Sequence, residues 1–158
     1  MEYKIECQVL PGGYLPSKKN IDDAGFDLYA TEDIKLYPGQ VIKHPLNIKL
    51  KLPYNTWASI TTKSGLGSQG QLVYSGVIDE GYRGIPHIVM TNVKYTKLIG
   101  KKENPVMQPN TEPIIIKRGQ KIAQMIISPH SYKFYIEKVK EVLADTERGT
   151  GGFGSTGA

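Results

Sequence analysis

Apolar and polar residues alternate along most of the chain in short runs, which is the pattern of half-buried β-strands. We expect strands in residues 2–10, 24–30, 34–36, 41–52, 57–62, 72–78, 85–93, 114–116, 122–127 and 132–139. No run shows the period of an amphipathic helix, and the Gly-rich residues 63–70 allow at most one helical turn. Roughly ten short strands predict an all-β fold, a jelly roll or a β-barrel with little helix.

Two stretches depart from the strand pattern. Residues 94–113 are polar and Pro-rich, which predicts a long surface excursion or a mobile loop. The last eleven residues contain five glycines and almost no side chains that could join a core. We therefore expect one domain over residues 1–147 and a flexible Gly-rich arm over residues 148–158.

The composition agrees with this organisation and narrows the range of partners. The chain has 158 residues, 39% hydrophobic and 22% charged, with 17 Gly and 10 Pro, as expected for one soluble domain with many tight turns. The net charge of +5 comes from scattered lysines and not from a basic arm. A polyphosphate ligand fits such a surface, and we expect no nucleic-acid partner. No apolar run approaches the ~20 residues of a membrane span, and the first residues do not resemble a signal peptide. We expect an intracellular protein, cytoplasmic or nuclear, without a membrane partner.

The cysteine and histidine residues carry no chemical signal. A single cysteine, Cys7, excludes a disulfide framework and a Cys-based metal site, and we interpret it as a buried strand residue. The three histidines, His44, His87 and His130, each adjoin a proline and lack the spacing of a metal site. We interpret all three as structural.

The most informative stretch is Gly76-Val77-Ile78-Asp79-Glu80-Gly81-Tyr82-Arg83-Gly84. Apolar residues on both sides indicate the tip of a β-hairpin, in which Gly81 can take the positive φ of a tight turn. A carboxylate, a phenol and a guanidinium within five positions are more than a turn requires. Asp79 beside Tyr82 is suited to activating a water next to a stacked sugar or ring. The alternative is a charged, solvated hairpin tip.

Two Gly-rich stretches carry groups that bind phosphates. Lys63-Ser64-Gly65 offers a cation, a hydroxyl and backbone amides, although it lacks the spacing of a Walker A loop and an ordinary loop is the alternative. In the C-terminal arm, Arg148 can fork onto a terminal phosphate and Phe153 can stack on a base. The arm resembles a lid over a nucleotide, and a disordered tail is the alternative.

Two polar residues lie within predicted strands. Gln124 enters a strand that is otherwise apolar, so its amide needs partners from the backbone or from a ligand. Asp27 faces away from the apolar side of its strand. It is either a solvated surface carboxylate or a group that holds water on a hydrated Mg²⁺.

Five stretches in this order resemble the five motifs of the trimeric deoxyuridine triphosphatases (dUTPases). They are Ala-Gly-Phe-Asp-Leu-Tyr-Ala, Lys-Ser-Gly-Leu-Gly, Gly-Val-Ile-Asp-Glu-Gly-Tyr-Arg-Gly, Gly-Gln-Lys-Ile-Ala-Gln and Arg-Gly-Thr-Gly-Gly-Phe-Gly-Ser-Thr-Gly. The resemblance implies a jelly-roll subunit and a homotrimer with three shared active sites. Each site would take the first, second and fourth motifs from one chain, the third from another, and a swapped C-terminal arm from the remaining one. The implied reaction is Mg²⁺-dependent hydrolysis of dUTP to dUMP and pyrophosphate.

The resemblance also implies roles for the residues of the third motif. Asp79 would hold and activate the water that attacks the α-phosphorus in line. Tyr82 would pack on the deoxyribose where a 2′-hydroxyl would have to fit. The backbone of Gly76, Val77 and Ile78 would hydrogen-bond the uracil edge, and fixed backbone groups discriminate between ligands better than an apolar pocket does.

The remaining motifs would bind the phosphates and close the site. Asp27 would act on Mg²⁺ through water. Arg148 would meet the γ-phosphate, and Phe153 would stack over uracil as the arm closes. The other substrate-binding residues implied by the resemblance are Lys63, Ser64, Gly65, Gln124, Gly154 and Ser155.

Three features depart from the usual motifs. Lys63 and Lys121 stand where arginine is common, and lysine keeps the charge but loses the bidentate fork. Residues 94–113 are longer than the common connection. Pro86 removes a backbone N–H just after the hairpin, so we expect it at a sheet edge or a bulge.

Two other functions remain alternatives at this point. A deoxycytidine triphosphate deaminase has a similar fold but needs a general base poised at the cytosine ring, which the third motif does not suggest. A nucleotide-gated regulatory protein would use closure of the arm as a switch, with residues 94–113 as its partner surface.

Overall fold

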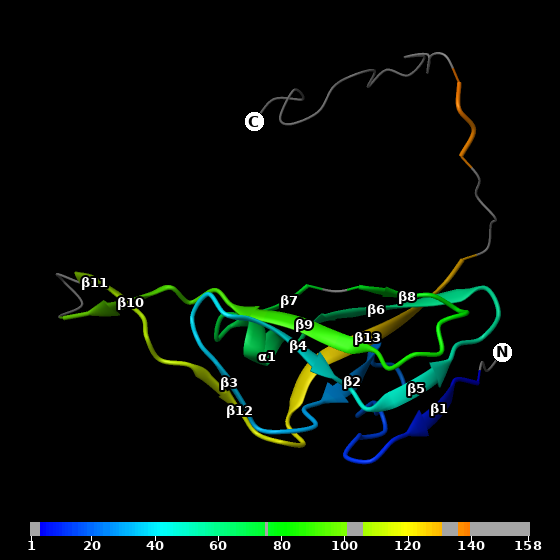
Figure 1. Ribbon diagram of the computed structural model, residues 1–158, viewed down its shortest axis with the longest axis horizontal. Coiled ribbons are helices and arrows are strands. Elements are labelled where there is room, and N and C mark those ends of the chain that lie inside the picture. The colour runs from blue at the N-terminus through cyan, green and yellow to red at the C-terminus, as the bar shows by residue number, and fades with distance from the viewer. Residues whose placement is uncertain (1–3, 75, 101–105, 131–135, 140–158) are drawn as a thin grey trace.

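The computed structural model describes residues 4–74, 76–100, 106–130 and 136–139, and nearly all of its regular structure is β-strand (Figure 1). The elements in chain order are β1 (Glu6–Val9), β2 (Gly25–Tyr29), β3 (Ile34–Leu36), β4 (Val41–Pro45), β5 (Ile48–Lys51), β6 (Thr56–Thr62), α1 (Ser64–Gly67), β7 (Gln71–Tyr74), β8 (Val77–Ile78), β9 (His87–Asn92), β10 (Thr96–Ile99), β11 (Val106–Pro109), β12 (Ile114–Ile116) and β13 (Lys121–Pro129). The single turn of α1 falls in the Gly-rich stretch where one helical turn was expected. These elements confirm the predicted all-β, jelly-roll-like fold.

The largest sheet has four strands in the order β2-β13-β6-β8. The long strand β13 lies inside it and is antiparallel to both neighbours, so that Gln124 stands opposite Asp27 on β2 and opposite Thr61 on β6. At the far edge, β8 pairs with β6 through only two residue pairs, Ala58 with Ile78 and Ser59 with Val77. The polar residues of the predicted site therefore lie on strands with a fixed relative register.

A second sheet, β4-β9-β7, and the short pairs β1-β5 and β3-β12 complete the body. The side chains buried most completely come from several of these units: Leu28, Leu36, Ile48, Ile88, Met90, Ile116, Ile122 and Met125. Each such side chain contributes about 1.5–3 kcal/mol when it leaves water. This shared core holds the strands that carry the site.

The predicted hairpin is only partly correct. Its arms do pair, because β7 runs antiparallel to β9 with Tyr74 opposite Val89. However, β8 leaves this pair and joins β6 in the other sheet. Gly81 does not have positive φ, since the five glycines that do in the described part of the chain are at other positions. Pro86 lies immediately before β9 and is buried, neither in an edge strand nor at a bulge, so its missing N–H falls outside the ladder.

Residues 94–113 form an excursion, as predicted, but not a loop. They contain the antiparallel hairpin β10-β11, in which Leu98 faces Met107, and Figure 1 shows it projecting from one end of the body. Its base is closed by a hydrogen bond of 2.8 Å from Asn110 N to Tyr95 O and another of 2.8 Å from Asn110 Nδ2 to Lys94 O. The alternation of apolar residues on these short strands is too brief to stand out in the sequence.

The strand predicted over residues 132–139 is not observed where it can be checked. Residues 132–135 lie outside the described part of the chain, and residues 136–139 have no regular structure. The strands expected between residues 41 and 52 are β4 and β5, which are separated at Asn47, whose φ of 50° is incompatible with a continuous strand.

Candidate functional site

The tip after β8 borders a hollow of about 250 Å³, lined by Lys43, Ile60, Gly76, Val77, Ile78, Asp79, Tyr82, Pro86 and His87. The lining includes all five residues of the third motif to which the sequence analysis assigned a role: Gly76, Val77, Ile78, Asp79 and Tyr82. Because β8 is an edge strand, only one of its sides is paired, and the backbone groups on the other side face no strand. The hollow thus combines a carboxylate, an aromatic ring and free backbone polar groups.

Tyr82 is held in place by its own turn. Its backbone N donates to Asp79 O at 3.0 Å, and its Oη donates to Ile85 O at 3.1 Å. The ring lies so close to Gly84 that a Cβ at this position would clash with Oη, Cζ and Cε2. Glycine at position 84 is therefore required for close approach of the ring and not for backbone φ.

Arg83 accounts for part of the unusual chemistry of this stretch. Its Nη1 donates to Glu80 O at 2.6 Å and to Tyr82 O at 2.9 Å. The guanidinium therefore stabilises the carbonyl groups of the turn. No role for Arg83 was predicted from the sequence, and the structure shows a local one.

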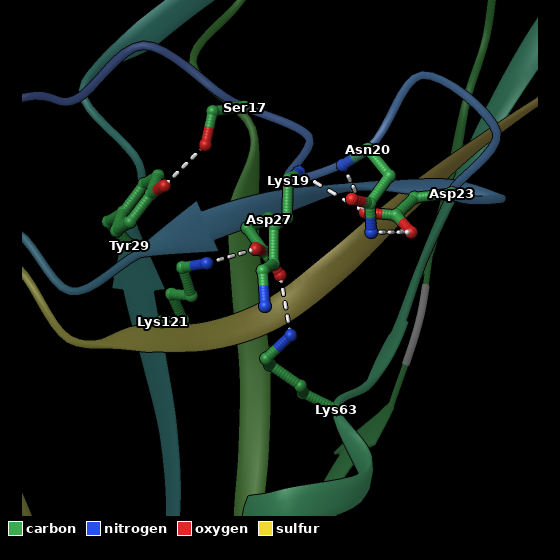
Figure 2. Close-up of polar contacts among 8 residues, drawn as sticks. All are labelled: Ser17, Lys19, Asn20, Asp23, Asp27, Tyr29, Lys63 and Lys121. Carbon is green, nitrogen blue, oxygen red and sulfur yellow. Dashed lines mark hydrogen bonds and ion pairs between the residues drawn. The ribbon is translucent and has the colours of Figure 1, made fainter.

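Asp27 is not a solvated surface carboxylate, so the first of the two interpretations made from the sequence is wrong. Its residue is only 8% exposed, and each oxygen meets a different ammonium group (Figure 2). Oδ1 lies 2.6 Å from Lys63 Nζ and Oδ2 lies 2.7 Å from Lys121 Nζ. Two lysines at the positions where the motifs usually have arginine therefore share one carboxylate.

The electrostatics of this cluster favour the charged carboxylate. Burial alone would raise the pKa of Asp27, but the hydrogen bonds and charges of Lys121 and Lys63 outweigh it and lower that pKa from its usual value. In return, Asp27 raises the pKa of Lys121. Such a cluster is stable because each charge that loses water gains a charged partner.

A second hollow, of about 280 Å³, opens beside this cluster and is lined by Lys19, Asn20, Asp23, Ala24, Gly25, Asp27, Lys63, Lys121 and Gln124. Gln124 lies against Gly25, where a Cβ would clash with the amide side chain. Asp23 holds the preceding loop by accepting from Lys19 N at 3.1 Å and from Asn20 N at 2.9 Å (Figure 2). The hollow presents ammonium and amide N–H groups, which suit an anion.

Ser64 and Gly65 follow Lys63 directly, at the start of α1. Both are exposed, and a Cβ at Gly65 would meet no atom within 4 Å, so the backbone there is open to a ligand. The structure thus groups Asp27, Lys63 and Gln124 around one hollow, with the Ser64-Gly65 turn adjoining Lys63.

The residues predicted to bind the nucleoside and those predicted to bind the phosphates line separate hollows and do not meet within one chain. Asp27 is on β2 and Asp79 follows β8, at opposite edges of the four-stranded sheet. Three strand spacings separate these edges, roughly 14 Å. Arg148, Phe153, Gly154 and Ser155 lie outside the described residues.

Several residues of the two hollows were not identified from the sequence as parts of the site. Lys121 was recognised only as a departure from a motif, Lys43 had no assigned role, and His87 was interpreted as structural. Lys43 and His87 reach the hollow through the pairing of β4 with β9, which places Pro45 opposite His87. Nothing in a single sequence specifies that register.

The structural interpretation of His44 agrees with the structure, and that of Cys7 agrees in part. Cys7 lies in β1 as predicted but is half-buried and not buried, and this partial burial raises the pKa of its thiol. His44 is buried and accepts a hydrogen bond of 3.0 Å from Thr31 N at Nε2. In the part of the chain that the structure describes, no group of three or more His, Cys, Asp or Glu side chains is placed to hold a metal ion. Likewise, no described helix is long and apolar enough to cross a membrane.

Comparisons with known proteins agree with this geometry. The dUTPase family model matches residues 13–157. The chain is 40% identical to the deoxyuridine 5′-triphosphate nucleotidohydrolase of Clostridium tetani over 163 residues, covering 99% of this chain and 98% of the relative. It is also 40% identical to the corresponding protein of Gloeothece citriformis over 146 residues, covering 90% and 88%.

Two further similarities concern a viral polyprotein and a solved structure. The chain is 37% identical over 149 residues to a Pol polyprotein of ovine maedi visna related virus, of which it spans 12%. The dUTPase of Staphylococcus bacteriophage 80alpha, solved with dUPNHPP, superposes with a TM-score of 0.80 at 25% identity, covering 98% of this chain and 99% of that one. The order of the five motifs, the strand arrangement and these matches lead to one conclusion: the chain belongs to the dUTPase family.

Proposed function

We propose that the chain hydrolyses dUTP to dUMP and pyrophosphate, which limits uracil in DNA and supplies dUMP. The observation that carries this function is the hollow at β8, where Asp79, Tyr82 and the unpaired backbone edge of residues 76–78 come together. The family match and the name of the C. tetani relative support the same reaction.

Asp79 is the proposed catalytic base. It is exposed at the tip and can hold a water for in-line attack on the α-phosphorus. The proton of that water passes to the Asp79 carboxylate as the new P–O bond forms and the bond to the leaving pyrophosphate breaks. Precise placement of this water accounts for much of the rate, because the reaction depends on positioning and electrostatics.

Selection of the nucleoside is proposed to rest on the edge strand and the ring. The free backbone groups of Gly76, Val77 and Ile78 would hydrogen-bond the uracil edge, and a narrow edge strand leaves little room for the methyl group of thymine. Tyr82, held against Gly84, would pack on the deoxyribose and exclude a 2′-hydroxyl. Backbone donors and acceptors cannot rotate to suit cytosine, which presents a different pattern.

The second hollow is the proposed site of the phosphate chain. Lys63 and Gln124 line it, and Ser64 and Gly65 adjoin it, so ammonium, amide, hydroxyl and backbone N–H groups are available. Arg148, Phe153, Gly154 and Ser155 would complete the contacts from the arm. We assign residues 1–147 to the catalytic domain and residues 148–158 to this arm.

Mg²⁺ is the proposed cofactor, bound mainly through the phosphate oxygens of the substrate. A carboxylate has about four lone-pair sites, of which the two lysines occupy two on Asp27. Asp27 can therefore still accept from a water on the ion, and the donor set fits this role. The ion would neutralise phosphate charge and fix the geometry of the triphosphate.

The placement of the two hollows supports a homotrimer with shared sites. Because Asp27 and Asp79 lie at opposite edges of one sheet, one substrate cannot use both from the same chain without a large rearrangement. We infer that the phosphate hollow of one chain faces the nucleoside hollow of another, with the arm of the remaining chain closing the site. This arrangement matches the division of motifs implied by the sequence.

The test of the reaction is release of pyrophosphate from dUTP, dTTP, dCTP and UTP, each with Mg²⁺ and with EDTA. We expect turnover of dUTP alone and loss of turnover on chelation. Turnover of all four nucleotides would contradict the account of selectivity. Release of ammonia from dCTP would instead support the deaminase alternative, and binding of dUTP without turnover would support the regulatory one.

A further inference from the structure

We propose that Glu80 is a positioning residue that holds the neighbouring Asp79 in place. Its Oε2 accepts a hydrogen bond of 2.9 Å from the backbone N–H of Asn55, which is 25 positions earlier in the chain. Glu80 is partly buried, while Asp79 is exposed. A backbone N–H bound to a partly buried carboxylate is a charge-assisted hydrogen bond, roughly twice as strong as a neutral one.

This hydrogen bond links the tip, residues 79–84, to another segment of the chain. The other side-chain hydrogen bonds of the tip stay within the turn itself. The side-chain hydrogen bonds of Tyr82 and Arg83 end on residues 80, 82 and 85, all within the same turn. The ladder between β8 and β6 stops at Ile78, one residue before Asp79. Among the described residues, Glu80 therefore supplies the side-chain hydrogen bond that links the tip to a separate segment.

The anchor point on the other side is well fixed. Asn55 has a φ of 57°, a left-handed conformation that asparagine adopts more readily than most residues and that is typical of a tight turn. Its carbonyl accepts from His130 N at 2.8 Å, and the adjacent Thr56 Oγ1 donates to Pro53 O at 2.7 Å. A carboxylate hydrogen-bonded to this turn is thus held against both the start of β6 and the end of β13.

The hydrogen bond of Glu80 affects how Asp79 is placed for attack of the water on the α-phosphorus. Glu80 and Asp79 share a peptide bond, so loss of this hydrogen bond would let the Asp79 backbone shift or fluctuate. A displacement of about 1 Å at a catalytic group can cost a factor of about 100 in rate. This inference rests on the proposed function, because it takes Asp79 as the group that orients water. It explains why a second carboxylate follows Asp79 in a tip that has no need of it for turn formation.

The experiment compares Glu80→Ala with Glu80→Gln, which keeps an oxygen that accepts from Asn55 N. We expect Glu80→Ala to lower kcat for dUTP at least tenfold with a change in KM below threefold, and Glu80→Gln to stay within about threefold of the parent. Glu112→Ala is the matched control, since Glu112 is hydrogen-bonded to Lys97 in the projecting hairpin, away from both hollows. It should leave kcat and KM unchanged.

A second readout does not depend on turnover. Amide hydrogen exchange over residues 76–84 should accelerate in Glu80→Ala and not in Glu80→Gln. Unchanged kcat and unchanged exchange in Glu80→Ala would overturn the role of Glu80, as would equal losses in both variants. A parent protein that turns over no dUTP would contradict the proposed function instead, and the exchange measurement would still decide whether Glu80 holds the tip.

Discussion

Lys121 Nζ lies 2.7 Å from Asp27 Oδ2, and the two side chains join the start of β13 to the middle of β2 (Figure 2). With Lys63 on the other oxygen, Asp27 forms a charged crosslink between β2, β13 and the turn before α1. The side chain of Asp27 is only 11% exposed, so its carboxylate is mostly shielded from water and is satisfied by the two lysines. All three residues of this crosslink line the hollow beside it.

Acid should weaken this crosslink. Because the folded pKa of Asp27 is lowered, its contribution to stability is present above the unfolded pKa of about 3.9 and is lost as pH falls through the folded value. We expect Tm to fall below about pH 4 in the parent and to change less over this range in Asp27→Asn. Thermal melts between pH 2.5 and pH 7 measure this, and parallel curves for the two proteins would contradict it.

The space at Gly84 should control the Tyr82 ring. In Gly84→Ala, the added Cβ clashes with the ring, so we expect kcat/KM for dUTP to fall about tenfold and discrimination against UTP to weaken. Gly81→Ala is the control, because a Cβ there meets no atom within 4 Å and φ is not positive. Steady-state kinetics with dUTP and UTP test both variants, and equal effects at the two glycines would refute the specific role of Gly84.

The sequence predicts the fold class and most strands because alternation is a local property. It also singles out Asp79, Tyr82 and the Lys63-Ser64-Gly65 stretch as candidate site residues, because their residue types are unusual for the turns they occupy, and their roles remain predictions. It does not predict that β8 changes sheets, since this depends on pairing with β6, about 20 residues earlier. Nor does it predict the two lysines on Asp27 or the bond from Asn55 to Glu80, because both require registers between distant strands.

The projecting hairpin should be dispensable for hydrolysis. β10 pairs with β11 alone, and Asn110 N donates to Tyr95 O, so the two ends of the hairpin already adjoin. We expect that replacing residues 96–109 with a two-residue Asn-Gly turn leaves kcat and KM for dUTP unchanged and shifts Tm by only a few degrees. Loss of dUTP hydrolysis in a folded variant would instead show that the hairpin contributes to the active site.

Removal of the arm should separate folding from activity. A chain that ends before Arg148 keeps every strand that the structure describes, so we expect a folded trimer by circular dichroism and size-exclusion chromatography. The rate of dUTP hydrolysis should fall sharply, because the groups proposed to close the site are gone. An unfolded or monomeric product would show that the arm helps to build the body.

Mixed trimers of two inactive variants should distinguish active sites shared between chains from sites formed within one chain. Asp79→Asn should bind dUTP but lose most of kcat, and Lys63→Met should bind the triphosphate weakly, so each variant alone should be nearly inactive. The two variants are then co-expressed in equal amounts so that mixed trimers form. In these trimers, a site regains both groups when its Lys63 comes from an Asp79→Asn chain and its Asp79 comes from a Lys63→Met chain. Random assembly gives this combination in about one quarter of the sites, so we expect roughly a quarter of the parental activity. If Asp27, Lys63 and Asp79 instead served one site within a chain, every mixed trimer would contain only defective sites, and activity would stay at the level of the separate variants.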